Sequence, residues 1–271
     1  MRVVVCAMAK NEHLYINDWV EHYCKLGFDK IYIFDNDDKD KPFIGDYIKN
    51  KNRVEIINIR GAHQPKLQHE IYTYFYHTYR FDWCLFCDID EFLFGINNIH
   101  SFLERPIFRN INQIRIKWKL FGDDNLIERD MSKPVYDVFK QEVKESLHRN
   151  LMQKGNLESQ GKMIVRGGLL NVVIKSPHFA SLFTRDNVIP SMLPSGRPCW
   201  SKVDIKENYT KETVFLHHYM TKSLSEFVKQ KLNRNDAVYN QKLKLDYYWR
   251  INKVTPEKIA YLKERKLWDK E

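Results

Sequence analysis

Two aspartates spaced one residue apart follow an apolar run in WCLFCDIDEFLF, Trp83–Phe94. In an extended strand Asp88 and Asp90 project from one face, and Glu91 points to the other. Withdrawing carboxylates from water is costly unless they are paired or bind a metal. Two converging carboxylates suit Mg²⁺ or Mn²⁺, which keep positions open for phosphate oxygens. The spacing predicts a divalent metal site at Asp88 and Asp90, with Glu91 in support and solvated surface acids as the alternative.

The elements that would position these acids alternate between β-branched runs and amphipathic segments, which predicts an α/β fold with a parallel sheet covered on both faces. Ligands of such sheets bind beyond the carboxyl ends of the strands, where Asp35, Asn36, Asp88 and Asp90 fall. No GxGxxG or GxxxxGK[ST] occurs in the first unit, so neither a Rossmann dinucleotide site nor a P-loop is indicated. The predicted strands are Arg2–Met8, Lys30–Asn36, Val54–Ile59 and Trp83–Asp90, and the predicted helices are Asn11–Gly27, Phe43–Lys49 and Pro65–Arg80.

The second half of the chain is less regular. It contains predicted strands at Gln113–Gly122, at both sides of Gly167 and Gly168, and before His218, followed by helices opened by Ser223 and by Pro256. Ser223 and Glu226 have the spacing of a capping box. We therefore expect a catalytic domain at 1–220 and a basic helical extension at 221–271 that packs on or beside it.

Three segments together resemble GT-A glycosyltransferases of the family 92 and family 2-like group. They are AMAKNEHLYINDWVEHYCKLGFDKIYIFDND, WCLFCDIDEFLF and HHYMTKSLSEFVKQK, and they run in the same order as in that group over roughly residues 3–231. The resemblance implies a Rossmann-like, mostly parallel sheet flanked by helices. It also implies metal-dependent transfer of a sugar from a nucleoside diphosphate, most often UDP, with inversion at the anomeric carbon. A glycan or lipid-linked acceptor of surface polysaccharide synthesis is the expected partner.

The resemblance also implies roles for single residues. The metal site would comprise Asp88, Asp90 and His218, with His217 as the alternative histidine, and would hold Mn²⁺ or Mg²⁺. His178, in an SPHF turn, would contact the donor or the acceptor. The residues expected to bind the donor are Lys10, Asn11, Glu12, Asp35, Gln64, Gln68, Lys162 and Lys222.

An inverting reaction needs a base that takes the proton from the acceptor hydroxyl. The candidates are Asp123 and Asp124, which follow WKLFG, and Asp186 in TRDN, with Glu158 as a further alternative. The family usually has small residues after this F-G pair, so the sequence departs from the family pattern at Asp123 and Asp124.

Charge and cysteine content bound the compartment and the partners. The chain has 271 residues and a formal net charge of +9, and Thr221–Glu271 holds 13 Lys and Arg against 7 Asp and Glu. This excess indicates either a solvated helical surface or attraction to a nucleotide, a lipid-linked acceptor or a membrane face. No nucleic-acid-binding motif is present, so we expect no nucleic acid partner.

The five cysteines show no disulfide framework. Cys84 and Cys87 form a CxxC whose thiols would point to opposite faces of a strand, which favours buried packing. The N-terminal apolar run is too short for a signal peptide, and no stretch reaches the roughly 18 apolar residues of a membrane span. We expect a cytoplasmic protein, with peripheral contact at the inner membrane face left open.

Two other functions compete with sugar transfer. A phosphatase of the haloacid dehalogenase type also uses DxD, but its nucleophilic Asp follows the first strand, where this sequence has MAKNE. A non-catalytic module could bind an anionic surface through the basic extension. Retention of both DxD acids and of HHY argues against that alternative.

Overall fold

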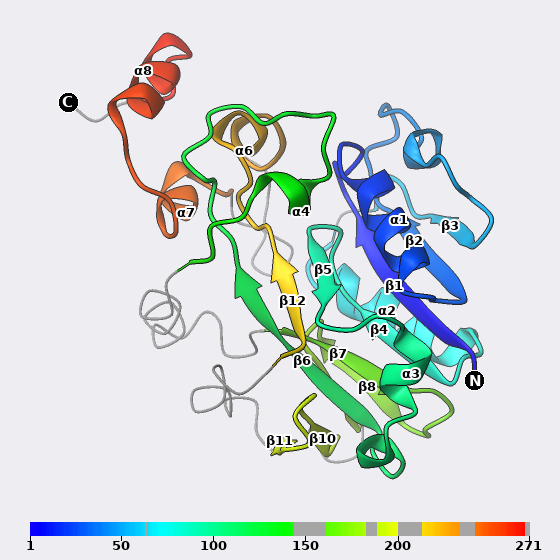
Figure 1. Ribbon diagram of the computed structural model, residues 1–271. Coiled ribbons are helices and arrows are strands. Elements are labelled where there is room, and N and C mark those ends of the chain that lie inside the picture. Colours follow the sequence, from blue (N-terminus) through cyan, green and yellow to red (C-terminus); the bar gives the residue numbers. More distant parts are fainter. Residues whose placement is uncertain (63, 144–160, 183–188, 200–212, 233–241, 269–271) are drawn as a thin grey trace.

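A mixed β-sheet forms the centre of the computed structural model, which describes residues 1–62, 64–143, 161–182, 189–199, 213–232 and 242–268 (Figure 1). The described strands of this sheet run in the order β11-β10-β6-β7-β4-β1-β2-β3, while β12 pairs with both β5 and β6. A separate pair, β8-β9, lies outside it. The strands are β1 Val3–Ala9, β2 Lys30–Asp35, β3 Val54–Asn58, β4 Trp83–Phe86, β5 Glu91–Phe94, β6 Gln113–Leu120, β7 Gly161–Arg166, β8 Val172–Ser176, β9 Phe179–Leu182, β10 Ser191–Met192, β11 Pro198–Cys199 and β12 Phe215–His218.

The first four strands form the parallel half of the sheet, as the sequence predicts. β1 pairs in parallel with β2 and β4, and β2 with β3. The chain therefore passes from β1 outward to β3 and returns to β4 on the other side of β1. Such a reversal leaves a crevice beyond the carboxyl ends of the two diverging strands, where ligands of α/β sheets bind. Beyond β4 the sheet is mixed, because β7 runs antiparallel to both β4 and β6.

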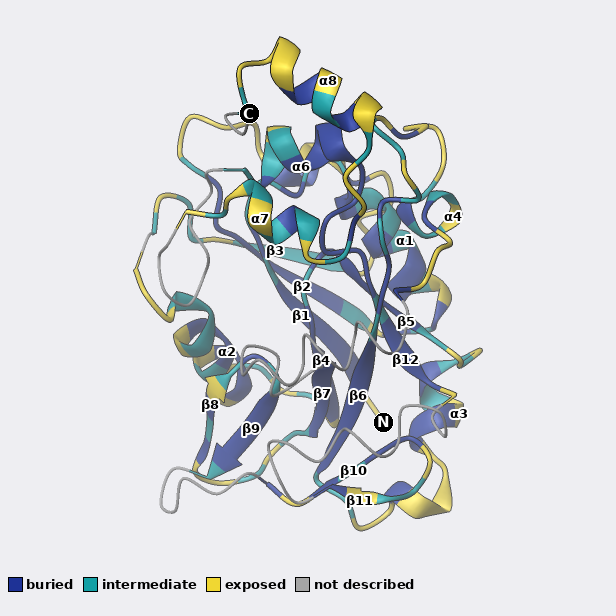
Figure 2. Ribbon diagram, turned by 90° about the vertical axis from the view of Figure 1, so that its left-hand side faces the viewer, coloured by how far each residue is buried: buried dark blue, intermediate teal, exposed yellow. Residues whose placement is uncertain are grey.

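Helices cover both faces of the sheet (Figure 2). Alternate residues of β1 enter two cores: Val3 and Val5 pack with α1, and Val4 and Cys6 pack with α2. Cys84 and Cys87 also belong to opposite cores, and all five cysteines are free, which confirms packing rather than a disulfide. The described helices are α1 Ile16–Lys25, α2 Leu67–Thr78, α3 Ile99–Leu103, α4 Val135–Val138, α6 Leu224–Gln230, α7 Leu245–Trp249 and α8 Pro256–Glu264, with 3₁₀ turns η1 Ile44–Tyr47 and η2 Pro106–Phe108.

Two predicted boundaries are wrong. The first helix begins at Ile16 rather than after an Asn11 cap, because Asn11 has φ 57° and its backbone N–H donates to Asp37 Oδ1 at 2.5 Å. The fourth strand ends at Phe86, so Asp88 and Asp90 lie in the turn between β4 and β5. The alternation of side chains that applies to a strand therefore does not apply to these two acids.

The C-terminal helices share a third, smaller core built from Leu224, Phe227, Tyr248, Tyr261 and Leu262. The capping box is confirmed: the Ser223 side chain accepts from the backbone N–H of Glu226, and the Glu226 carboxylate accepts from that of Ser223. α8 begins at Pro256 as predicted. No helix among the described residues is long and apolar enough to cross a membrane. The division at residue 220 stays a prediction.

Candidate functional site

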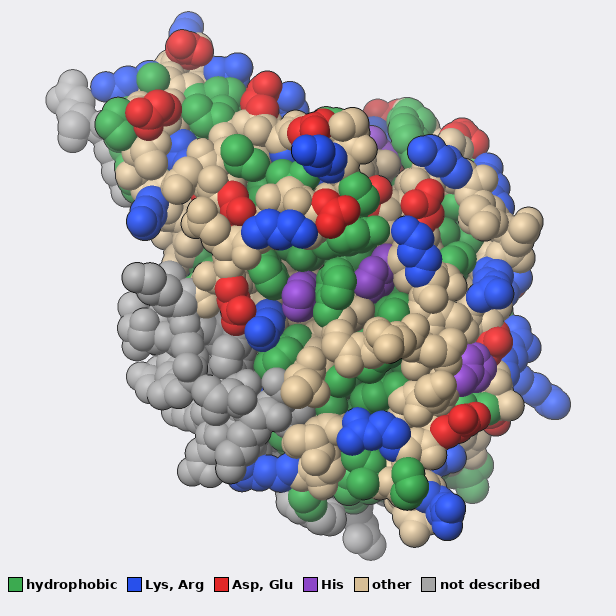
Figure 3. Space-filling view, viewed as in Figure 1, with side chains coloured by type: hydrophobic (Ala, Val, Ile, Leu, Met, Phe, Trp, Pro, Cys, Tyr) green, Lys and Arg blue, Asp and Glu red, His purple; other side chains and the backbone are tan. Residues whose placement is uncertain are grey.

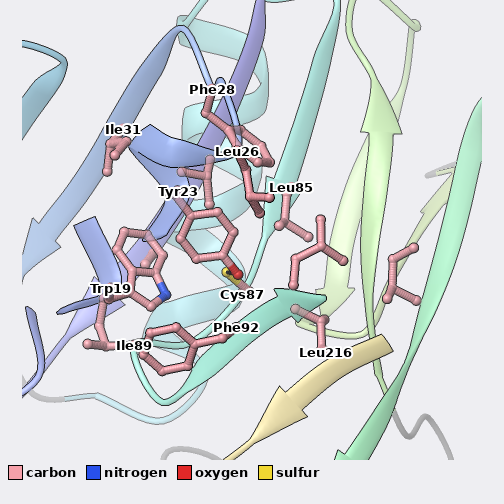
Figure 4. Packing of buried hydrophobic residues seen from close by; sticks show 14 of the residues in the cluster. Trp19, Tyr23, Leu26, Phe28, Ile31, Leu85, Cys87, Ile89, Phe92 and Leu216 are labelled. Atoms are coloured by element: carbon pink, nitrogen blue, oxygen red, sulfur yellow. Dashed lines mark hydrogen bonds between the residues drawn. The ribbon is translucent and has the colours of Figure 1, made fainter. Parts of the chain in front are cut away.

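The turn that carries the acids is anchored to α1. Trp19 Nε1 donates to the backbone oxygen of Asp88 at 3.0 Å, and the Tyr23 hydroxyl donates to that of Glu91 at 3.1 Å. Figure 4 shows both rings packed beside Cys87, Ile89 and Phe92. The fully buried Glu91 closes the turn, since its Oε2 accepts from the backbone N–H of Asp88 at 2.9 Å. Glu91 therefore has the supporting role predicted for it.

Asp88 is held by two side chains from neighbouring elements. Lys162 Nζ of β7 lies 2.7 Å from Asp88 Oδ2, and Gln68 Nε2 of α2 donates to Oδ1 at 2.8 Å. Burial raises the pKa of Asp88, but the ion pair and hydrogen bond with Lys162, together with the nearby His218, bring the pKa below its ordinary value. Lys162 also lies 3.6 Å from Glu91 Oε1. Two of the eight predicted donor residues, Gln68 and Lys162, thus reach Asp88 in the acidic turn.

Asp90 faces three basic groups from the other end of the sequence. Lys231 Nζ lies 2.6 Å from Oδ2, Lys222 Nζ lies 3.8 Å from Oδ2, and His218 Nε2 lies 3.5 Å from Oδ1. The side chain of Asp90 is only 8% exposed. Burial alone would raise its pKa, yet Lys231, His218 and Lys222 together hold the pKa well below its usual range. Asp90 is therefore a buried, ionised carboxylate within a cluster of three basic side chains.

Lys222 is a buried ammonium on a strained backbone. Its φ is 57°, in the left-handed region, and its side chain is 2% exposed. The ammonium lies 3.9 Å from Glu12 Oε2 and 3.7 Å from the centre of the Tyr15 ring, and it makes no hydrogen bond to the part of the chain that is described. Burial is the main cause that lowers the pKa of Lys222 to about 8. Backbone strain and an unmet donor at a buried cation are features that cluster at functional sites, which makes Lys222 a candidate site residue.

The predicted pairing of Asp88 and Asp90 around one metal ion is not what the structure contains. The two carboxylates lie in a turn and each contacts its own lysine, and no three His, Cys, Asp or Glu side chains in the described ranges come together to hold an ion. Asp90 Oδ1 and His218 Nε2 do face each other at 3.5 Å. This distance is that of an ion pair, and Lys231 and Lys222 reach the other oxygen of the same carboxylate, so a metal ion at these two residues is a matter for the proposed function.

Of the two histidines, only His218 faces this cluster. His217 stacks on Phe94, with ring centres 4.3 Å apart, on the other side of the strand. The predicted His178 is nearby: its Nδ1 lies 2.8 Å from the backbone oxygen of Gly161, and its ring contacts Trp118, which also contacts His218.

The remaining donor residues are spread over the sheet edge. Lys10 Nζ pairs with Asp38 at 3.5 Å. The backbone N–H of Asn11 donates to the Asp37 side chain, which follows the end of β2. Asp35 was expected to meet the base or ribose of the donor, but its carboxylate is fully buried, with Arg60 Nε at 3.8 Å, and offers no exposed surface to either. Gln64 is exposed and donates to Glu70 at 2.5 Å.

The acids proposed as the base have structural contacts. Asp123 is buried and accepts from the Tyr248 hydroxyl and from Lys258 of α8. Asp124 accepts from the backbone N–H groups of Lys140 and Gln141. These contacts do not leave either carboxylate facing the basic cluster around Asp90, so the prediction is not supported for this pair. Asp186 and Glu158 lie outside the described residues.

Lys231 is the residue of this cluster that sequence reasoning missed. It is the C-cap of α6, and its ammonium donates both to Asp90 and, at 2.6 Å, to the backbone oxygen of Met220. The motif HHYMTKSLSEFVKQK ends on this lysine. A lysine at the C-terminal end of a helix is most often exposed, so only the packing of α6 against the acidic turn reveals this contact.

The family model described as glycosyltransferase family 92 matches residues 1–242, and no curated protein matches the chain. The S. aureus TarS 1–349 crystal structure aligns at 14% identity and TM-score 0.37, over 61% of this chain and 47% of that one. A second TarS structure, in complex with UDP-GlcNAc, aligns at 12% identity and TM-score 0.37, over 61% and 45%. The mannosyltransferase PcManGT from Pyrobaculum calidifontis, in complex with GDP-Man and Mn²⁺, aligns at 10% identity and TM-score 0.32, over 42% and 35%. The chain thus spans about half the length of the first of these structures.

Proposed function

Because this chain belongs to glycosyltransferase family 92, we propose that it moves a sugar from a nucleoside diphosphate, UDP in the first instance, to a glycan or lipid-linked acceptor. The α/β fold of the GT-A type predicted for such an enzyme is confirmed. Surface polysaccharide synthesis remains the process that fits this chemistry best.

The observation that carries the proposal is a cluster of buried lysines around the acidic turn, near the carboxyl ends of β1 and β4. Lys162, Lys222 and Lys231 are each less than a tenth exposed, and all three face the acidic turn. Transfer of the sugar leaves negative charge on the departing diphosphate, and fixed cations in a water-poor site stabilise such charge strongly. Lysine is a common phosphate-binding side chain. The cluster therefore supports binding of a diphosphate beside the acidic turn.

Metal dependence belongs to the same proposal. Asp90 and His218 would hold Mn²⁺ or Mg²⁺, and such an ion would neutralise charge on the diphosphate oxygens. Asp88 orients the Lys162 ammonium and the Gln68 amide, both of which contact its carboxylate. These contacts make Asp88 a positioning residue for the diphosphate.

Inversion at the anomeric carbon requires a base on the acceptor side. Asp186 and, as its alternative, Glu158 are the candidates that remain from the sequence. His178, whose pKa burial lowers to about 3, is uncharged at neutral pH and supports contact with a sugar hydroxyl near Trp118.

A cytoplasmic location with peripheral contact to the membrane face is part of the proposal and is motivated by the basic extension. On the face in Figure 3, the C-terminal helices carry Lys and Arg interspersed with Asp and Glu rather than one continuous basic surface. Any membrane attraction through this face is therefore modest and sensitive to salt.

A thermal-shift panel of nucleotide sugars with Mn²⁺ tests the function. A ligand at 100 times its Kd stabilises the native state by about 2.7 kcal/mol, which raises the melting temperature by roughly 5 °C or more. We expect this shift from a UDP-sugar in the wild type and in the exposed control Asp40→Asn, and its loss in Asp90→Asn. No shift with any nucleotide sugar would contradict the proposal.

A further inference from the structure

A buried asparagine joins the C-terminal helices to the segment that carries Lys222. Asn252 lies in the connection between α7 and α8, and its side chain makes three hydrogen bonds. Its Nδ2 donates to Thr221 Oγ1 and to the backbone oxygen of Tyr248, each at 3.0 Å. Its Oδ1 accepts from the backbone N–H of Asp123 at 2.8 Å. One amide therefore fixes the residue before Lys222 against α7 and against the turn after β6.

Lys222 needs such support because its backbone is strained. Its φ of 57° lies in the left-handed region, and a lysine stays there only where the surrounding structure enforces it. The residue after it is held by the capping box, in which the backbone N–H of Ser223 donates to Glu226 Oε2 at 3.1 Å. The residue before it, Thr221, is buried and is held by Asn252. The strained backbone is thus fixed from both sides.

The position of the Lys222 ammonium depends on this backbone conformation. Its Nζ lies 3.8 Å from Asp90 Oδ2 and 3.7 Å from the centre of the Tyr15 ring. Relaxation of φ to the common negative range would turn the side chain away from this direction. A protein whose competent conformation is only partly populated binds its ligand more weakly, in proportion to the fraction that is competent. Loss of the support at Thr221 should therefore weaken any ligand that Lys222 binds.

We propose that Asn252 is a positioning residue for the diphosphate: through Thr221 it keeps Lys222 in the strained conformation that presents the ammonium to the ligand. This inference rests on the proposed function. It assigns a role in donor binding to the C-terminal helices, because Asn252 lies outside residues 1–242, the range of the family match. The support that these helices give to Lys222 is separate from their surface charge.

Calorimetric titration with UDP tests this inference through two matched substitutions. Thr221→Val replaces the hydroxyl that accepts from Asn252 by a methyl group of similar size. The control Thr255→Val removes the hydroxyl that accepts from the backbone N–H of Lys258 at the start of α8, at 3.4 Å. Both variants lose one hydrogen bond of the C-terminal helices, so both should be less stable than the wild type. Only Thr221→Val should bind UDP more weakly, by roughly threefold to tenfold, which is the range that one ordinary hydrogen bond allows.

The same titrations in a Lys222→Met background separate positioning from a general loss of structure. Because Asn252 acts through Lys222, Thr221→Val should there weaken UDP binding by less than roughly twofold. An equal fold-change in both backgrounds overturns the inference, and so does a Thr255→Val variant that loses as much UDP affinity as Thr221→Val. Asn252→Ala, judged by the same comparisons, decides the question if Thr221→Val does not fold. If the wild type binds UDP and a folded Thr221→Val binds it equally well, only this inference fails, whereas absence of any UDP binding removes the proposed function as well.

Discussion

Replacement of Asp123 by asparagine separates a structural role of this acid from the catalytic role that its position suggested. Asp123 is buried beside the C-terminal helices, where its carboxylate accepts from the Tyr248 hydroxyl and from Lys258 of α8, and its backbone N–H donates to Asn252 Oδ1 at 2.8 Å. Lys258 itself is fully buried. Asp123→Asn therefore leaves an ammonium in the core without a counter-ion.

The expected cost follows from this burial. Removal of one partner of a buried ion pair costs about 3–5 kcal/mol, mainly because the other charge stays unpaired. For a chain of this size, each kcal/mol corresponds to roughly 2–4 °C, so the melting temperature should fall by roughly 10 °C. Replacing both partners, in Asp123→Asn with Lys258→Met, should recover much of the loss.

The assay combines chemical denaturation with sugar-transfer kinetics at a temperature where every variant is folded. Asp123→Asn should lose stability while kcat stays within a fewfold of the wild type. The control Asp124→Asn replaces one of the two oxygens that accept from the backbone N–H groups of Lys140 and Gln141, and should lose about 1 kcal/mol. An Asp123→Asn variant of unchanged stability whose kcat falls a hundredfold or more would show that Asp123 is the base and refute the structural role.

Two further predictions concern pH and packing. Burial lowers the pKa of His22 to about 4, so between pH 6.5 and pH 4 the unfolded chain takes up a proton that the folded chain refuses. The free energy of unfolding should therefore fall as the pH is lowered through this range. Urea unfolding at pH 7 and pH 5 should show a loss that is about 2 kcal/mol larger in the wild type than in His22→Gln. Equal losses in the two proteins would contradict the burial of an uncharged His22. A Cβ at Gly161 would lie 1.9 Å from the backbone oxygen of Ile116, whereas one at Gly168 meets nothing within 4 Å. Both glycines have positive φ, so the two substitutions differ mainly in the clash with Ile116. Urea unfolding should show that Gly161→Ala lowers the free energy of unfolding by about 1–3 kcal/mol more than Gly168→Ala does. Equal losses would contradict the close pairing of β6 with β7 beside Lys162.

The order of the strands and helices was predictable from sequence because buried strands and half-buried helices each require a characteristic spacing of apolar residues. The β-branched run at the N-terminus is buried on both faces, and the capping box at Ser223 is a local motif whose hydrogen bonds need only neighbouring residues. The end of the fourth strand was not predictable. The hydrogen bonds that Trp19 and Tyr23 donate to the acidic turn come from a helix far away in the sequence.

The sequence predicted most of the residues of the candidate site, but it did not predict which of them contact one another. Asp88, Asp90, Lys162, Lys222 and His218 do meet at one edge of the sheet. Their pairing depends on which lysine reaches which carboxylate across the fold, and local spacing carries no such information. For the same reason, local sequence suggested Asp123, after the F-G pair, as the base that deprotonates the acceptor. Its carboxylate instead accepts a hydrogen bond from Lys258 of α8, which lies far away in the sequence.

The affinity for UDP tests most directly whether the basic cluster is a diphosphate site. Calorimetry should compare the wild type with Lys222→Met and with the exposed control Lys229→Met. A charge-assisted hydrogen bond contributes about 1.5–3 kcal/mol, so Lys222→Met should bind UDP roughly tenfold or more weakly while Lys229→Met matches the wild type. Equal UDP affinity in a folded Lys222→Met and in the wild type would contradict the assignment of the diphosphate to this cluster.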